Sequence, residues 1–78
     1  MLRLKLIEET ESRVVYNYFP EQEKECGTVV FDKNKGDIID ANISSNDSHG
    51  RYMHHAVSKI AEFFQSGVYS EDIIVAWY

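Results

Sequence analysis

Only one stretch of this 78-residue sequence repeats its apolar side chains with the period of a helix. From Met53 to Phe64 these side chains recur at three- and four-residue spacing, and the polar ones fall largely on the opposite side. A run of Ser, Asn and Asp precedes the stretch, so we expect Asp47 or Ser48 as the N-cap and an end near Gly67. One helix can cover only one face of a sheet, so a sheet built from the remaining residues keeps an open face.

The other apolar residues have the patterns of β-strands. Leu2, Leu4 and Leu6 alternate with basic residues, the period of two that is typical of a strand with one dry face. Asn34 and Gly36 lie in a polar segment between two β-rich runs, as a hairpin turn requires. The strands that we expect span residues 2–6, 14–19 (ended by Pro20), 28–31 (opened by Gly27), 38–43 and 73–78.

This order of elements predicts one α+β domain over residues 1–78, a five-stranded, mainly antiparallel sheet (β-β-β-β-α-β) with one helix packed on one face. A crossover through the helix returns the last strand beside the first, so the predicted spatial order is 4-3-2-1-5. The run Ile73–Tyr78 has no charged side chain and is apolar throughout, which is typical of an interior strand.

The charge and the single cysteine limit the classes of partner and compartment. Thirteen acidic residues against eight basic ones give a net charge of -5, which repels a phosphate backbone, so we expect no nucleic-acid partner. Cys26 has no second cysteine with which to form a disulfide, which favours a reducing, cytoplasmic location. The N-terminal segment alternates leucine with basic residues and offers no apolar run for a signal peptide or membrane span.

Three segments carry a resemblance to other sequences: Tyr16–Pro20, the strand that begins at Gly27, and the C-terminal Ala76-Trp77-Tyr78. In these segments the chain resembles small uncharacterised proteins of Gram-positive bacteria that also end in Ala-Trp-Tyr. The resemblance implies the same arrangement of strands and helix, and it implies no activity, cofactor or site residue.

The only cluster with metal-binding chemistry is His49, His54 and His55, beside Asp47. Two ligands on one helical face need a spacing of three or four residues, whereas His54 and His55 diverge by about 100° around the helix axis. Cys26 has acidic neighbours, which disfavour a reactive thiolate. We therefore assign no catalytic, metal-binding or cofactor-binding residue and expect no cofactor. A small metal-dependent or hydrolytic enzyme that uses the histidine cluster remains an alternative.

The apolar residues of the strands exceed what one helix can cover. Strict alternation directs one set toward the helix: Leu2, Leu4, Leu6, Val29, Phe31, Ile39, Ala41 and Ile43. It directs another set to the open face, where we predict a partner-binding surface made by Val30, Ile38, Val15 and Phe19. The sequence thus predicts a non-enzymatic module that uses this face to bind a protein partner or to form a homodimer. A further alternative is an acidic decoy that occupies a nucleic-acid-binding protein.

Overall fold

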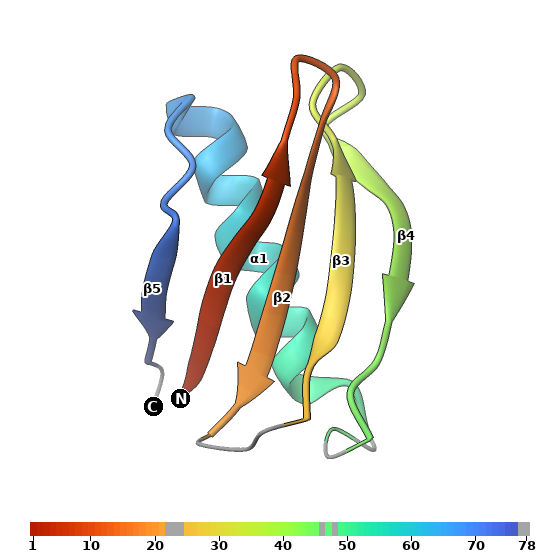
Figure 1. The fold of residues 1–78 in the computed structure, drawn as a ribbon, viewed down its shortest axis with the longest axis vertical. Helices are drawn as coiled ribbons and strands as arrows, with labels where there is room; N and C mark the ends of the chain where they lie inside the picture. Colours follow the sequence, from red (N-terminus) through yellow and green to blue (C-terminus); the bar gives the residue numbers. More distant parts are fainter. Residues whose placement is uncertain (22–24, 46, 48, 77–78) are drawn as a thin grey trace.

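The computed structural model describes residues 1–21, 25–45, 47 and 49–76. They form five strands in one sheet, ordered β4-β3-β2-β1-β5, with each strand antiparallel to its neighbours, and one helix packed on one face (Figure 1). The predicted fold class and spatial order are therefore confirmed. The elements are β1 (Leu2–Glu9), β2 (Arg13–Pro20), β3 (Gly27–Asp32), β4 (Asp37–Asn42), α1 (Arg51–Ser66) and β5 (Asp72–Val75).

The turns between the paired strands are held by side chains of the turn residues. Between β1 and β2, Thr10 Oγ1 accepts a hydrogen bond from the N–H of Arg13 at 3.1 Å. Between β3 and β4, Asp32 Oδ1 accepts from the N–H of Asn34 at 2.7 Å, and Gly36 has a φ of 69°. A positive φ costs glycine little, so this turn forms where the sequence predicts it.

β5 lies at an edge of the sheet, where it pairs with β1. The prediction of an interior strand is therefore wrong. Ile73 and Val75 pack against the core, while Ile74 between them is 59% exposed. The apolar run thus has one covered face and one open face, because the helix covers the sheet on one face alone. Trp77 and Tyr78 lie outside the described residues.

Helix α1 begins later than the sequence predicts. Its N-cap is Gly50, with a φ of 69°, and not Asp47; Ser48 lies outside the described residues. The Asp47 carboxylate nevertheless accepts from two N–H groups of the first helical turn, those of Tyr52 at 3.1 Å and Met53 at 2.9 Å. An acceptor that lies several residues before the helix therefore satisfies donors that an N-cap side chain normally takes. The helix ends at Ser66 with Gly67 as its C-cap, so the predicted end near Gly67 is confirmed.

The core lies between α1 and the central strands. Its buried apolar side chains are Leu2, Leu4, Val14, Tyr16, Tyr18, Val29, Phe31, Ala56, Ile60 and Phe63. Beside it, the Tyr18 hydroxyl donates to Asp47 Oδ2 at 3.0 Å and accepts from the N–H of Ser44 at 2.9 Å. Burial is the main cause that raises the pKa of Tyr18 to about 12. These bonds fasten the connection before α1 to the middle of the sheet.

Candidate functional site

Strand β4 is exposed along its whole length, although half of its six residues are apolar. The reason is the position of α1, whose main contacts are with β1, β2, β3 and β5. In Figure 1, α1 crosses behind the three central strands, and β4 lies beyond it on the right. Because the helix does not extend over β4, the strand keeps a solvent-facing surface on the helix side as well as on the open face.

The strand register decides which side chains of β4 share the face of the helix. Ile38 lies opposite Phe31, and Ala41 lies opposite Val29. Directly opposed residues in an antiparallel pair project from the same face, and both partners belong to the core, so Ile38 and Ala41 lie on the helix side. The prediction that Ile38 lies on the open face with Val30 is wrong. A bulge between these two pairings inserts one extra residue, Ile39, and shifts the alternation.

The predicted covering of β4 by the helix is also wrong. Ala41 has the predicted orientation but is exposed, and Ile39 is 56% exposed in the bulge. Ile43, just after the strand, is 59% exposed. Ile43 does approach the start of the helix, because a Cβ placed on Gly50 would lie 3.9 Å from its Cδ1 atom. The sequence pattern predicts the face of a strand residue, but the position of the helix decides whether that face is covered.

Phe64 extends this apolar surface from the sheet onto α1. Its ring centroid lies 5.7 Å from that of Phe31, and a Cβ placed on Gly36 would lie 2.8 Å from its Cε2 atom. The ring therefore covers the β3–β4 turn while the side chain stays 37% exposed, close to the 38% of Ile38. We name this surface the β4 strip and define it as Ile38, Ala41, Ile43 and Phe64.

Two aspartates of β4 lie on the open face of the sheet, opposite Asp32 and Val30 of β3. Asp37 Oδ1 accepts from the N–H of Ile38 at 2.7 Å, and Asp40 Oδ1 accepts from the N–H of Ala41 at 2.9 Å. Strand β4 contains no basic residue, and both aspartates are exposed. On the open face, the β4 edge of the sheet is thus negatively charged.

The open face of the sheet brings together two of the residues predicted to bind a partner. Val15 and Val30 lie directly opposite each other on β2 and β3, and both are half-buried. Their outer neighbours are acidic: Glu8 lies opposite Val15, and Asp40 lies opposite Val30. The two valines therefore form a small apolar centre between charged strands.

Phe19 lies on the same open face, two pairs further along β2, and is also half-buried. A polar pair separates it from the valines, since Thr28 Oγ1 donates to Asn17 Oδ1 at 3.0 Å. Arg3 lies opposite Phe19 on β1. The predicted patch is thus divided: Val15 and Val30 meet, Phe19 lies apart from them, and Ile38 is on the other face.

The histidines at the start of α1 do not converge on one point. His49 and His54 are exposed, His55 is half-buried, and the ring centroids of His54 and His55 are 5.9 Å apart. The neighbouring Asp47 is only 3% exposed, and its oxygens accept from Tyr18 and from the start of the helix. Among the residues that the structure describes, no group of three or more His, Cys, Asp or Glu side chains could hold a metal ion.

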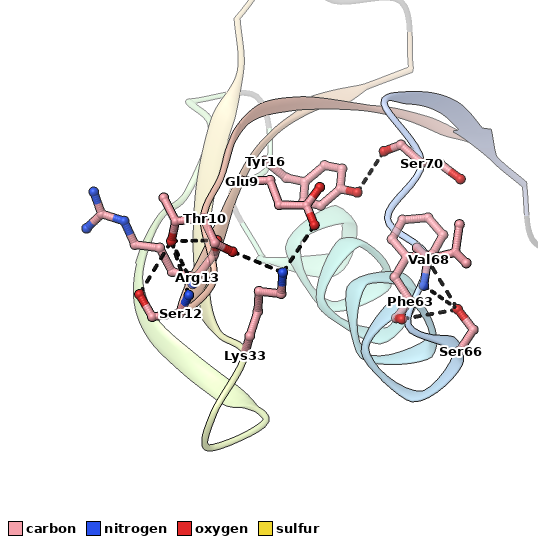
Figure 2. Close-up of polar contacts among 10 residues, drawn as sticks. All are labelled: Glu9, Thr10, Ser12, Arg13, Tyr16, Lys33, Phe63, Ser66, Val68 and Ser70. Atoms are coloured by element: carbon pink, nitrogen blue, oxygen red, sulfur yellow. Dashed lines mark hydrogen bonds and ion pairs between the residues drawn. The ribbon is translucent and has the colours of Figure 1, made fainter.

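Lys33, at the β3–β4 turn, helps to hold the fold together. Figure 2 shows Lys33 reaching across to the β1–β2 turn, where its Nζ donates to Glu9 Oε2 at 3.1 Å and to the Thr10 carbonyl at 3.0 Å. The same Nζ lies 5.0 Å from the ring centroid of Tyr69. Nearby, the Tyr16 hydroxyl donates to the Ser70 carbonyl at 2.7 Å. Lys33 therefore links two turns and the segment after α1, and this charge is already neutralised.

Comparison with protein-family models finds no match, and comparisons with curated proteins and with solved structures find none either. Within the described part of the chain, the helix is too short and too polar to cross a membrane.

Proposed function

We propose that this chain is a non-enzymatic module that binds another protein through an uncovered apolar surface of its sheet. The observation that supports this best is the β4 strip, where Phe64, an exposed apolar side chain of α1, contacts Phe31, the strand partner of the exposed Ile38. Apolar surface that is contiguous and bordered by polar residues is typical of protein-binding sites. A partner that covered the β4 strip would remove this surface from water, which is the main favourable contribution to most protein associations.

The open face remains a second candidate surface for the same function. Val15 and Val30 lie side by side there, but they are half-buried and have acidic neighbours. They therefore offer less accessible apolar surface than Ile43, which is 59% exposed. We accordingly favour the β4 strip. The proposal includes a cytoplasmic location, which the single thiol of Cys26 supports.

Capture from an extract of the host with three matched baits tests the proposal. The first is the wild-type chain, the second carries Ile38→Thr and Ile43→Thr, and the third carries Val15→Thr and Val30→Thr. Threonine is β-branched and polar, so each change keeps the strand propensity and the charge while removing apolar surface. We expect a protein that the wild-type and Val15/Val30 baits retain and that the Ile38/Ile43 bait loses.

Loss on the Val15/Val30 bait alone would transfer the binding site to the open face and contradict our choice of surface. Equal capture by all three baits, or capture of no specific protein, would contradict the proposed function. Sedimentation of the wild-type chain tests whether the β4 strip binds a second copy of the chain instead. A dimer that the Ile38→Thr and Ile43→Thr changes dissociate would show self-association through this surface.

A further inference from the structure

We propose that the outer edge of β4 pairs with an extended segment of a partner protein whose side chains are alternately apolar and basic. This inference rests on the proposed binding function and specifies how the partner binds and which chemistry it carries. It is supported by the hydrogen-bonding groups at the β4 edge, by the different side chains on the two faces of β4, and by a comparable pairing elsewhere in the sheet.

Strand β4 is an edge of the sheet, and within the described residues its backbone has a neighbouring strand on one side alone. The N–H of Ile38 donates to Asp37 Oδ1 at 2.7 Å, and the N–H of Ala41 donates to Asp40 Oδ1 at 2.9 Å. In both cases the acceptor is the side chain of the preceding residue. Such an acceptor indicates an N–H group that points away from β3, toward the free edge where a further strand can pair.

The register with β3 supports this orientation of the two N–H groups. On β3, the partners of Ile38 and Ala41 are two residues apart, because the bulge takes up the extra residue on β4. Pairs that are two positions apart on an antiparallel ladder belong to the same class, so both N–H groups point to the same side of β4. An added strand would therefore form its hydrogen-bonded pairs with Ile38 and Ala41.

The two faces of β4 carry different chemistry. Ile38 and Ala41 lie on the helix side, because their partners on β3 belong to the core. Asp37 and Asp40 lie on the open face, where Asp32 of β3 is directly opposite Asp37. Strand β4 has no basic residue. The edge is thus apolar on the helix side and negatively charged on the open face.

A strand added to this edge would continue both faces, because directly opposed residues project from the same side of a sheet. Its residues opposite Ile38 and Ala41 would lie on the helix side, where apolar side chains would cover part of the β4 strip. The residues between them would lie on the open face, where lysine or arginine would pair with Asp37 and Asp40. Since β4 has six residues, a segment of about six residues matches its length.

A pairing of this kind already exists at the other edge of the sheet. In β1, Leu2 and Leu4 are fully buried under the helix. Between and after them, Arg3 and Lys5 lie on the open face, beside the edge strand β5. Arg3 donates to the two carboxylate oxygens of Asp72 on β5 at 2.9 and 2.6 Å. An alternating apolar and basic strand is therefore a partner that the aspartate of an edge strand accepts in this sheet.

The charge opposes a second copy of the chain as the occupant. Two β4 edges paired about a two-fold axis would place Asp37 and Asp40 of both copies on one face of the joint sheet. Each chain also has a net charge of -5. Carboxylates at an edge protect it against pairing with its own copies, whereas a basic segment is attracted to them. The same residues thus exclude one partner and select the other.

A titration with synthetic peptides tests the inference. The probe is an eight-residue peptide with blocked ends in which Val and Lys alternate, added at low salt to the ¹⁵N-labelled full chain and followed by amide chemical shifts. Two control peptides are used: one has four Val followed by four Lys, and the other replaces every Lys with Glu. We expect saturable shifts centred on residues 37–42 with the alternating peptide, and no saturable shifts with either control.

N-methylation of the peptide separates strand pairing from contact between side chains. Opposed residues of a hydrogen-bonded pair exchange both N–H···O bonds, so the valines opposite Ile38 and Ala41 would donate to the β4 backbone. Methylation of the valine N–H groups should therefore abolish saturable binding. Methylation of the lysine N–H groups, which would point away from β4, is the matched control and should leave the affinity nearly unchanged.

Two variants of the chain test the role of charge. Asp37→Asn with Asp40→Asn keeps an oxygen acceptor for each N–H group and removes the charges, so affinity should fall about three- to tenfold at low salt. Glu62→Gln with Glu71→Gln removes the same charge from exposed positions on α1 and before β5, and the affinity should stay close to that of the wild-type chain. Equal losses in the two variants, or no loss in the first, would contradict the inference.

Four other results would also overturn it: no saturable binding of the alternating peptide, equal binding of the valine-methylated peptide, shifts centred on Val15 and Val30, or a wild-type dimer that pairs through β4. Failure of the inference is distinguishable from failure of the function. If the alternating peptide does not bind, but the Ile38→Thr and Ile43→Thr changes still remove a captured protein, then the mode of binding is wrong and the binding function stands. If both experiments are negative, both proposals are wrong.

Discussion

Replacing Tyr18 with phenylalanine should destabilise the protein, although the change removes a single oxygen atom and keeps the ring. That oxygen donates to Asp47 Oδ2 at 3.0 Å and accepts from the N–H of Ser44 at 2.9 Å. Both of these partners are 3% exposed, so water cannot readily take the place of the phenol. The variant keeps a buried carboxylate that has lost one of its donors.

The magnitude follows from the two bonds. A hydrogen bond to a charged group contributes about 1.5–3 kcal/mol and a neutral one about 1 kcal/mol, so the expected loss is about 2–4 kcal/mol. A domain of this length has a free energy of unfolding of roughly 4–12 kcal/mol. The loss is therefore a large fraction of the total, and it corresponds to a fall in melting temperature of about 10–25 °C.

Urea unfolding followed by far-ultraviolet circular dichroism measures this loss. We expect a lower midpoint with an unchanged slope, because the surface exposed on unfolding is the same. Tyr52→Phe is the matched control: its hydroxyl donates to Glu21 Oε1 at 2.6 Å, and that carboxylate is exposed, so the midpoint should barely move. Equal midpoints for Tyr18→Phe and the wild-type chain would refute the account of the network.

Three further predictions concern pH, glycines and histidines. Burial raises the pKa of Tyr16 and Tyr18 above their ordinary value of 10.0, so their contribution to stability is complete below about pH 10 and is lost as the pH rises toward 12; urea titrations from pH 8 to 12 should show a plateau and then a decline. Gly27→Ala should largely prevent folding, because the new Cβ would lie 2.0 Å from Tyr18 Cε1, whereas Gly67→Ala has nothing within 4 Å and meets only the strain of a φ of 79°, about 1 kcal/mol; expression and melting curves compare the two. Replacing His49, His54 and His55 together with alanine should leave the melting temperature almost unchanged, because two of the three side chains are exposed, and metal analysis of the wild-type chain should find no stoichiometric zinc. A loss of several kcal/mol in the triple variant, or stoichiometric zinc in the wild-type chain, would contradict this prediction.

Much of the fold could be predicted from local sequence patterns. The alternation of Leu2, Leu4 and Leu6 predicts a strand with one buried face, and Leu2 and Leu4 are fully buried. Gly67 predicts the end of the helix, because a positive φ there is easy for glycine alone. The spatial order of the strands followed from the short connections and the single crossover. These features depend on residues close together in the chain, so the sequence carries them plainly.

The faces of β4 could not be predicted, because they depend on a bulge and on the path of the helix. Ile39 interrupts the alternation, and its sequence neighbours give no signal of this. The bulge moves Ile38 to the face of Phe31. The exposure of Ala41 follows from the packing of α1 on the other four strands, a tertiary contact that no local pattern encodes.

The start of the helix lies later than the sequence predicts for a related reason. The side chain of Asp47 is typical of an N-cap, and this carboxylate does accept from the first turn of α1. The chain nevertheless continues to Gly50, whose positive φ of 69° lets it turn into the helix. Asp47 also accepts from Tyr18, which lies 29 residues earlier in the sequence. A bond between such distant residues could not be foreseen from the order of elements.

The free energy of unfolding of the Ile38→Thr, Ile43→Thr chain tests most directly the claim that the β4 strip is surface and not core. Ile38 is 38% exposed and Ile43 is 59% exposed, so we expect each change to cost no more than about 1 kcal/mol. The Val15→Thr, Val30→Thr chain, altered on the half-buried open face, gives the matched comparison. A loss of about 2–4 kcal/mol for each isoleucine, as in buried positions, would show that these side chains hold the fold together and would contradict the claim.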